Sequence, residues 1–251
     1  MLREKVVFGP IRSRRLGSSL GINLLPERGK LCNFDCIYCE CGWNRDGRSD
    51  KILPLQESVR EALEAKLTFC VSEGIGIDSI TFSGDGEPTL HPQFGPIVAD
   101  VLALRDRYCP QARVSVLSNA TRLDVPEVFA ALRRIDAPIL KLDAPDNALA
   151  ARINRPQGAY DVGRVVEGMK RFEGDFILQT MFLRARGFDS SAPEVLQAWM
   201  EIVREVRPRE IMAYTIARPT PMAGLAKFSR EEMAALLRPL TEEGFNIKIY
   251  E

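Results

Sequence analysis

Three cysteines stand close together in the first part of the chain. Cys32, Cys36 and Cys39 have the spacing C-x3-C-x2-C, which offers three thiolates and no fourth at the usual spacing. A closed zinc site or an electron-transfer cluster takes four protein ligands, whereas a cubane held by three cysteines leaves one iron open. The pattern therefore predicts an iron–sulfur cluster that can bind a small molecule at its open iron.

This spacing, with the aromatic Tyr38 directly before the third cysteine, resembles the signature of the radical S-adenosylmethionine (radical SAM) superfamily. The resemblance implies one 4Fe-4S cluster on Cys32, Cys36 and Cys39, with SAM bound at the open iron through its amino and carboxylate groups. It also implies reductive cleavage of SAM to methionine and a 5′-deoxyadenosyl radical, which abstracts hydrogen from a substrate. Tyr38 is then expected to lie along the adenine.

A glycine-rich turn follows the second predicted strand. Its sequence, from Phe82 to Thr89, is FSGDGEPT, and it resembles the family's Gly-Gly-Glu region, which holds the SAM ammonium group. Glycines let the backbone approach a ligand closely, and a carboxylate accepts hydrogen bonds from an ammonium group. Asp85 interrupts the double glycine. The SAM-binding residues expected in this turn are Gly84, Asp85, Gly86 and Glu87, and the alternative is an ordinary turn.

Polar residues at the ends of later predicted strands complete the expected cofactor site. Ser118, Asn119, Asp143 and Gln179 are the candidates, with Asn119 and Asp143 preferred as ribose contacts. A second interpretation is that Ser118 and Asn119 shape a turn while Lys141 and Asp143 pair with each other.

No catalytic residue is assigned from the sequence, but basic side chains could bind an anionic substrate. The candidates are Lys141, Arg12, Arg14 and Arg218. Arginine forks suit carboxylates and phosphates, although most surface arginines only face solvent. The single histidine, His91, is expected to be structural.

The elements that must position these residues alternate along the chain. Buried strands are predicted at 19–25, 78–83, 113–118, 138–143, 176–183 and 210–216, and helices at 55–73, 93–108, 124–135, 162–172 and 195–203. Alternating strands and helices favour a parallel sheet with right-handed crossovers, and six units are too few for an eight-stranded barrel. The expected fold is α/β, a partial (β/α)6 TIM-type barrel with a C-terminal helix-strand extension.

One domain is expected over residues 1–251. A basic N-terminal segment covers 1–18, the partial barrel 19–216 and the C-terminal extension 217–251. Asp124 with Glu127 is predicted to cap one helix, and Ser229 with Glu232 forms a capping box for the last helix, which Gly244 ends. A final strand is predicted from the alternation of apolar residues over 245–249.

Composition limits the function classes. Lys plus Arg and Asp plus Glu both total 34, so no overall positive field attracts nucleic acid or an anionic membrane. No window of about 18 uninterrupted apolar residues indicates a membrane span. We expect a cytoplasmic protein whose six cysteines are thiols or ligands rather than disulfides. Cys70 lies on the apolar stripe of a predicted helix and is expected to be buried.

Most of the chain resembles one branch of the superfamily, that related to the tRNA-modifying enzyme 4-demethylwyosine synthase; Arg152–Pro156 is one of the resembling segments. Two departures stand out. Residues 1–31 contain no cysteine, so the second cluster of the tRNA enzymes is not expected there. No flavodoxin-like extension is expected, so the resemblance implies an external one-electron donor of the flavodoxin or ferredoxin type. The expected substrate is a small molecule or nucleoside-like compound.

Three other functions stay open at this point. A tRNA-base-modifying enzyme of the wyosine type would bind tRNA with a steep salt dependence. A glycyl-radical activating enzyme would share the cluster and SAM but act on a protein backbone. A non-enzymatic metal or redox module would use Cys41 as a fourth ligand.

Overall fold

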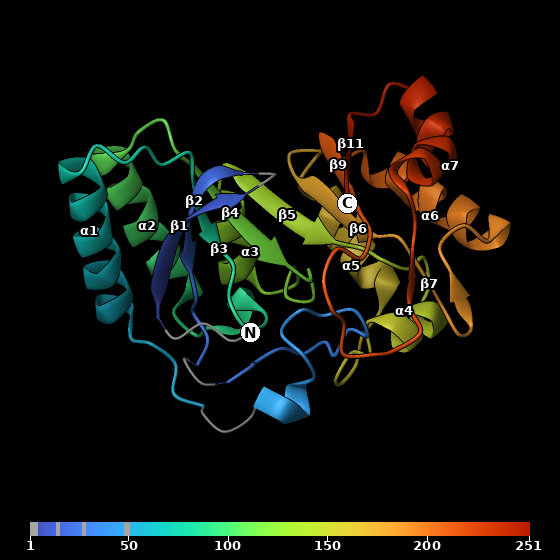
Figure 1. The fold of residues 1–251 in the computed structure, drawn as a ribbon, viewed down its shortest axis with the longest axis horizontal. Helices are drawn as coiled ribbons and strands as arrows, with labels where there is room; N and C mark the ends of the chain where they lie inside the picture. Colours follow the sequence, from blue (N-terminus) through green and yellow to red (C-terminus); the bar gives the residue numbers. More distant parts are fainter. Residues whose placement is uncertain (1–4, 14–15, 27–28, 48–50) are drawn as a thin grey trace. The chain divides into compact units, whose positions relative to one another are not determined.

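The computed structural model describes residues 5–13, 16–26, 29–47 and 51–251. The chain forms two compact units. The first unit contains Met1–Cys32, Asn44–Ser118 and Asp124–Pro138, and the second contains Asn33–Trp43, Asn119–Leu123 and Ile139–Glu251. Both units combine sheet strands with helices, as the ribbon in Figure 1 shows.

The first unit carries four strands in the order β1-β2-β3-β4. They are β1 (Val7–Ser13), β2 (Gly17–Ile22), β3 (Ser79–Phe82) and β4 (Arg113–Ser118). The pairs β2–β3 and β3–β4 are parallel, and β1 is antiparallel to β2. All four residues of β3 are buried, which is typical of a parallel strand covered on both faces.

Helices α1 (Gln56–Ser72), α2 (Phe94–Tyr108) and α3 (Pro126–Leu132) belong to the same unit. Helices α1 and α2 lie side by side (Figure 1). The buried residues of α1 recur at helical spacing, namely Val59, Leu63, Leu67 and Cys70, so the predicted apolar stripe and the burial of Cys70 are confirmed.

The second unit continues with parallel pairs in the order β5-β6-β9-β11. Its strands are β5 (Ala137–Lys141), β6 (Ile177–Met181), β9 (Glu210–Tyr214) and β11 (Ile247–Tyr250), and the residues of β5 from Ile139 onward belong to this unit. The register aligns Lys141 with Gln179 and Gln179 with Met212, which puts these side chains on one face of the sheet.

Four helices lie in the second unit. They are α4 (Asn147–Ile153), α5 (Val162–Lys170), α6 (Pro193–Val206) and α7 (Arg230–Glu242). Asp146 and Asp161 accept hydrogen bonds at the starts of α4 and α5, as N-cap residues do. At α7, the predicted capping box of Ser229 and Glu232 is present.

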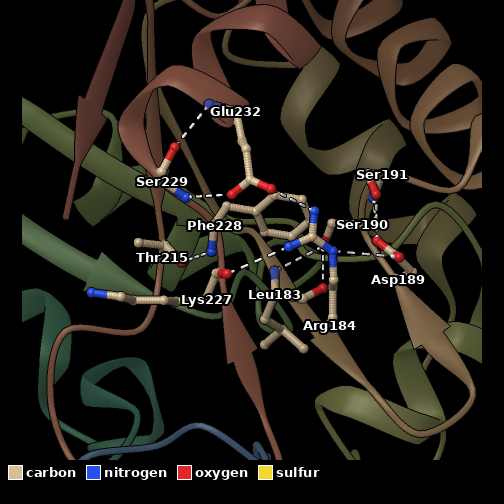
Figure 2. Close-up of polar contacts among 10 residues, drawn as sticks. All are labelled: Leu183, Arg184, Asp189, Ser190, Ser191, Thr215, Lys227, Phe228, Ser229 and Glu232. Atoms are coloured by element: carbon tan, nitrogen blue, oxygen red, sulfur yellow. Dashed lines mark hydrogen bonds and ion pairs between the residues drawn. The ribbon is translucent and has the colours of Figure 1, made fainter.

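A small three-stranded sheet also belongs to the second unit, in the order β10-β7-β8. Its strands are β7 (Leu183–Ala185), β8 (Phe188–Asp189) and β10 (Ala226–Lys227). Figure 2 shows how Arg184 ties this sheet to α7: its guanidinium lies 3.7 Å from the Phe228 ring centroid, with Nη2 3.0 Å from Glu232 and Nε 3.6 Å from Asp189. This sheet was not predicted.

One predicted helix cap is wrong, and one strand was not predicted. Helix α3 begins at Pro126 after an N-cap at Val125 that makes no side-chain hydrogen bond, so Asp124 does not cap it. Proline at the first helical position, which needs no backbone donor, starts the helix instead. Strand β1, which lies before the first predicted strand at 19–25, was not predicted. Among the described residues, no helix is long and apolar enough to cross a membrane.

Candidate metal and cofactor site

The loop that carries Cys36 and Cys39 is held along the end of α4, within the second unit. The backbone N–H groups of Asp35 and Ile37, on either side of Cys36, donate to the carbonyls of Asn154 and Ile153, both at 2.9 Å. The Cys39 N–H donates to the Cys36 carbonyl at 3.1 Å and closes a turn. These backbone hydrogen bonds fix the course of the loop without using the thiol groups.

A buried polar cluster lies beside Cys36. Tyr38 Oη donates to Asp143 and accepts from Lys141 Nζ at 2.9 Å, while Lys141 Nζ lies 3.7 Å from Asp143 Oδ2. Asn154 Nδ2 donates to Asp143 Oδ2 at 2.6 Å and is 3.4 Å from Cys36 Sγ. Lys141 and Asp143 therefore form an ion pair, as the alternative interpretation of the sequence predicts.

Burial and charge shift the pKa values in this cluster. Burial raises the pKa of the Cys36 thiol to about 11, so this side chain needs a nearby cation or metal to become a thiolate. Burial and the neighbouring Asp143 also raise the pKa of Tyr38 above its ordinary value. Burial by itself lowers the pKa of Lys141, but the nearby groups Asp143, Cys36, Cys39 and Tyr214 together outweigh burial, so the pKa is raised and the lysine stays charged.

Asn119 and Gln179 are the other cofactor candidates of the second unit. Asn119 donates to Asn33 Oδ1 at 2.7 Å and accepts from the Thr121 hydroxyl at 2.7 Å, which matches the turn-shaping alternative. Gln179 is half-buried on β6, opposite Lys141 in register. Asn33, which lies between Cys32 and Phe34, thus joins the cysteine loop to the segment after β4.

In the first unit, the glycine-rich turn contacts the residue directly before Cys32. Leu31 N donates to the Asp85 carbonyl and Glu87 N donates to the Leu31 carbonyl, both at 3.0 Å. Gly86 has a φ of +140°, and a Cβ there would lie 1.8 Å from the Leu31 carbonyl oxygen. This close approach requires glycine. At Gly84, a Cβ would lie 2.0 Å from the side-chain oxygen of Asn23.

Glu87 and Ser118, both predicted to bind the cofactor, contact each other in the first unit. Glu87 is only 2% exposed, and its Oε1 accepts from Ser118 Oγ at 2.9 Å, Thr89 Oγ1 at 2.6 Å and Thr89 N at 3.1 Å. Asp85 is fully buried, and its backbone N–H donates to Asn23 Oδ1 at 3.2 Å. The turn therefore contains both the buried carboxylate of Glu87 and the Gly86 backbone, which lies close to the Leu31 carbonyl.

Of the basic candidates, Arg12 is exposed on β1, and Arg218 is exposed with its Nη1 2.7 Å from Glu40. Arg14 lies outside the described residues. His91 contacts the Pro54 carbonyl through Nε2 at 2.9 Å and accepts from Gln93 N through Nδ1 at 3.1 Å, in keeping with a structural role.

The three cysteines of the loop have the chemistry that an iron–sulfur cluster requires. Cys32 and Cys39 are half-buried and Cys36 is buried, and none of the three forms a disulfide. Among the described residues, no three His, Cys, Asp or Glu side chains converge on the position of a single metal ion. A cubane takes its thiolates on separate iron atoms and receives hydrogen bonds at sulfur. The N–H donor at Cys36 Sγ and the three thiols fit that chemistry.

Comparison with known proteins identifies the class. The model of the radical SAM superfamily matches residues 27–182, which include all three cysteines, the glycine-rich turn and the Asp143 cluster. The chain belongs to the radical SAM superfamily. Membership implies a 4Fe-4S cluster and SAM.

Among individual proteins, it is 30% identical over 224 residues to a UPF0026 protein of Synechocystis sp., covering 86% of this chain and 77% of the relative. It is 29% identical over 238 residues to the GTPase Obg of Brachyspira hyodysenteriae, covering 92% of this chain but only 33% of the relative.

Solved structures show the same fold. A radical SAM methyltransferase from Sphaerobacter thermophilus superposes with a TM-score of 0.68 at 13% identity, over 92% of this chain and 65% of that chain. The structure of anSMEcpe with bound AdoMet (SAM) gives 0.60 at 17% identity, over 92% of this chain and 63% of that one. The predicted partial-barrel α/β fold is confirmed.

Sequence reasoning missed Asn154. Its side chain, 2% exposed, contacts Cys36, Tyr38 and Asp143. The segment Arg152–Pro156 resembles the superfamily branch, but its sequence alone indicates no role for Asn154. A polar residue just after a short amphipathic segment could have signalled a helix end, but not its contact with a cysteine 118 positions earlier.

Proposed function

We propose that this protein cleaves SAM reductively at one 4Fe-4S cluster and uses the resulting radical to abstract hydrogen from a substrate. The observation that carries the proposal is the C-x3-C-x2-C loop, whose three cysteines form no disulfide and lie inside the region that matches the superfamily model. When bound and reduced, the cluster supplies one electron that splits SAM into methionine and a 5′-deoxyadenosyl radical.

The residues of the chain have binding and positioning roles in this proposal. Cys32, Cys36 and Cys39 hold the cluster. Glu87 accepts from the SAM ammonium group, supported by its burial and by Ser118, which fixes one carboxylate oxygen at 2.9 Å. The Gly86 backbone can approach a ligand closely because it has no side chain.

Four more residues complete the proposed cofactor and substrate contacts. Tyr38 lies along the adenine, and Asn119 contacts the ribose. Gln179 and Lys141 face the same side of the sheet, where Lys141 is the basic group proposed to meet an anionic part of the substrate. Asp143 has a different role from the ribose contact first expected, because its carboxylate already accepts from Tyr38, Asn154 and Met181 N. We assign it to holding Tyr38 and Lys141 in place.

The substrate proposed is a small molecule or nucleoside-like compound, and the electron comes from a separate flavodoxin- or ferredoxin-type donor. The equal numbers of acidic and basic residues support this over a dedicated tRNA binder. The fold alone carries no information on substrate. The proposal is therefore open to a screen that does not assume the substrate.

The test begins with anaerobic reconstitution of the chain with iron and sulfide. With SAM and dithionite, we expect 5′-deoxyadenosine, and none when dithionite is omitted. Alanine at Cys32, Cys36 or Cys39 should abolish the product, whereas Cys109→Ala, which changes a half-buried cysteine outside the loop, should not. Undiminished product from all three loop variants would refute the proposal.

A second stage identifies the substrate. The reconstituted protein is incubated with pools of deuterated metabolites or nucleosides, and 5′-deoxyadenosine is examined for deuterium by mass spectrometry. Deuterium in the product from one pool identifies the class of hydrogen donor. Transfer from a protein backbone glycine instead would favour a glycyl-radical activating enzyme.

A further inference from the structure

The sulfur of a cluster-ligating cysteine is an acceptor whose hydrogen bonds affect the reduction potential. A donor that points at the sulfur stabilises the extra negative charge of the reduced cluster and so raises its potential. Cys36 is buried, so water cannot supply that donor freely. The chain itself must provide it.

Asn154 lies in position to do so. Its Nδ2 is 3.4 Å from Cys36 Sγ, within the range of N–H···S hydrogen bonds, and the residue is 2% exposed. Its backbone carbonyl also accepts from Asp35 N at 2.9 Å, next to Cys36 in sequence. The same residue therefore holds the loop through its backbone and reaches the sulfur through its side chain.

Counting hydrogens shows where the amide points. Asn154 Nδ2 has two N–H groups and three nearby acceptors, at 2.6 Å for Asp143 Oδ2, 3.2 Å for Tyr38 Oη and 3.4 Å for Cys36 Sγ. Tyr38 Oη already accepts from Lys141 at 2.9 Å. One N–H thus belongs to Asp143, which fixes the amide plane, and the other is directed toward Cys36 and Tyr38.

We infer that Asn154 is a positioning residue that donates a hydrogen bond to Cys36 Sγ and raises the reduction potential of the cluster. The inference rests on the proposed function, because it requires the cluster on Cys36. Asp143 acts on the cluster only indirectly, because its carboxylate orients the Asn154 amide. Neither residue contacts substrate in this role.

The experiment is a redox titration of the reconstituted, SAM-free chain, followed by EPR of the reduced cluster. Asn154→Leu removes the donor at similar volume, and we expect a lower potential. A tenfold change in the reduction equilibrium corresponds to about 59 mV for one electron. The matched control is Asn147→Leu, which changes the other end of α4, where Asn147 accepts from Val162 N at 2.7 Å.

A potential unchanged by Asn154→Leu, with full iron content, overturns the inference while leaving the proposed function intact. If the wild-type chain forms no reducible cluster, the proposed function itself fails. If the Asn154→Leu variant does not assemble a cluster, the hydrogen bond is tested instead in the wild-type protein, by pulsed EPR with 15N in the asparagine side chains. A weak 15N coupling to the reduced cluster is expected, and its absence contradicts the hydrogen bond.

Discussion

Gly86 occupies a position where any side chain would collide with the backbone just before Cys32. Its φ is +140°, and an added Cβ would lie 1.8 Å from Leu31 O. Strained backbone of this kind costs about 1–3 kcal/mol, and the collision adds to it. We expect Gly86→Ala to lower the free energy of unfolding by at least that amount and to reduce the iron bound on reconstitution.

The control for this change is Gly76→Ala, because a Cβ at Gly76 meets nothing within 4 Å. Chemical unfolding and iron analysis of both variants check the prediction. Equal iron content and equal stability in the two variants would show that the contact between Gly86 and Leu31 is unimportant.

The carboxylate of Glu87 is the group that we propose for the SAM ammonium. Hydrogen bonds to charged groups contribute about 1.5–3 kcal/mol, so Glu87→Gln should weaken SAM binding about ten- to a hundredfold. Equilibrium dialysis of labelled SAM with the reconstituted protein measures this. Glu61→Gln, on the exposed face of α1, should leave the affinity unchanged, and a wild-type affinity in Glu87→Gln would remove Glu87 from the site.

Some functional residues can be recognised from the sequence and others cannot. The three cysteines and Glu87 stand in short local patterns, so their types and spacing carry the signal. Asn154 has no such pattern, because its meeting with Cys36 depends on the path of the whole intervening chain. For Asp143, the strand end was predicted, but its contacts with Lys141 and Tyr38 depend on the direction of side chains.

At the level of elements, the Thr215 hydroxyl connects the end of β9 to the segment that leads to α7. Thr215 Oγ1 accepts from Phe228 N at 2.8 Å, and both residues are buried (Figure 2). Thr215→Val keeps the shape but leaves the N–H without this partner, which should cost about 1–3 kcal/mol. Thr241→Val, at an exposed position of α7, should change stability by less than about 0.5 kcal/mol.

Urea unfolding of the two variants beside the wild type gives the comparison. A Thr215→Val protein as stable as Thr241→Val would show that Phe228 N finds another partner. The result bears on the small sheet of the second unit, because Phe228 directly follows β10.

His91 joins two other elements, since it ends the short helix Pro88–Leu90 and receives a hydrogen bond from the N-cap of α2, Gln93. Burial lowers the pKa of His91 from its ordinary value of 6.5. The folded state then favours the neutral ring, so stability should fall as the pH drops below 6.5, where the unfolded chain takes up the proton more readily.

Unfolding free energies at about pH 7.5 and about pH 5.5 test this prediction, with the neutral variant His91→Gln as reference. The wild type should lose more stability than His91→Gln on acidification. Equal losses in the two proteins would mean that His91 titrates normally in the folded state.

Elements with strong periodicity were predicted well. The stripe of α1 and the alternation of strands and helices follow from local patterns, and their order gave the α/β fold. Strand β1 was missed because its sequence, VFGPIRS, contains a glycine and a proline that argue against a strand. The strands of the small sheet contain two or three residues each, too few to show any period.

At the scale of the whole molecule, the family and the fold indicate a radical SAM core but no particular substrate. The chain spans about a third of the Brachyspira relative and 65% of the Sphaerobacter methyltransferase. Similar cores thus occur within longer proteins of different names. The activity proposed above depends on features contained in the matched region 27–182.

The central claim is that Cys32, Cys36 and Cys39 hold a cluster with one iron open to SAM. EPR of the anaerobically reconstituted and reduced protein, recorded before and after SAM is added, tests it most directly. We predict a 4Fe-4S signal whose shape changes with SAM, both in the wild type and in Cys41→Ala. A signal that SAM leaves unchanged, together with loss of the cluster in Cys41→Ala, would mean a closed four-cysteine site and would contradict the account.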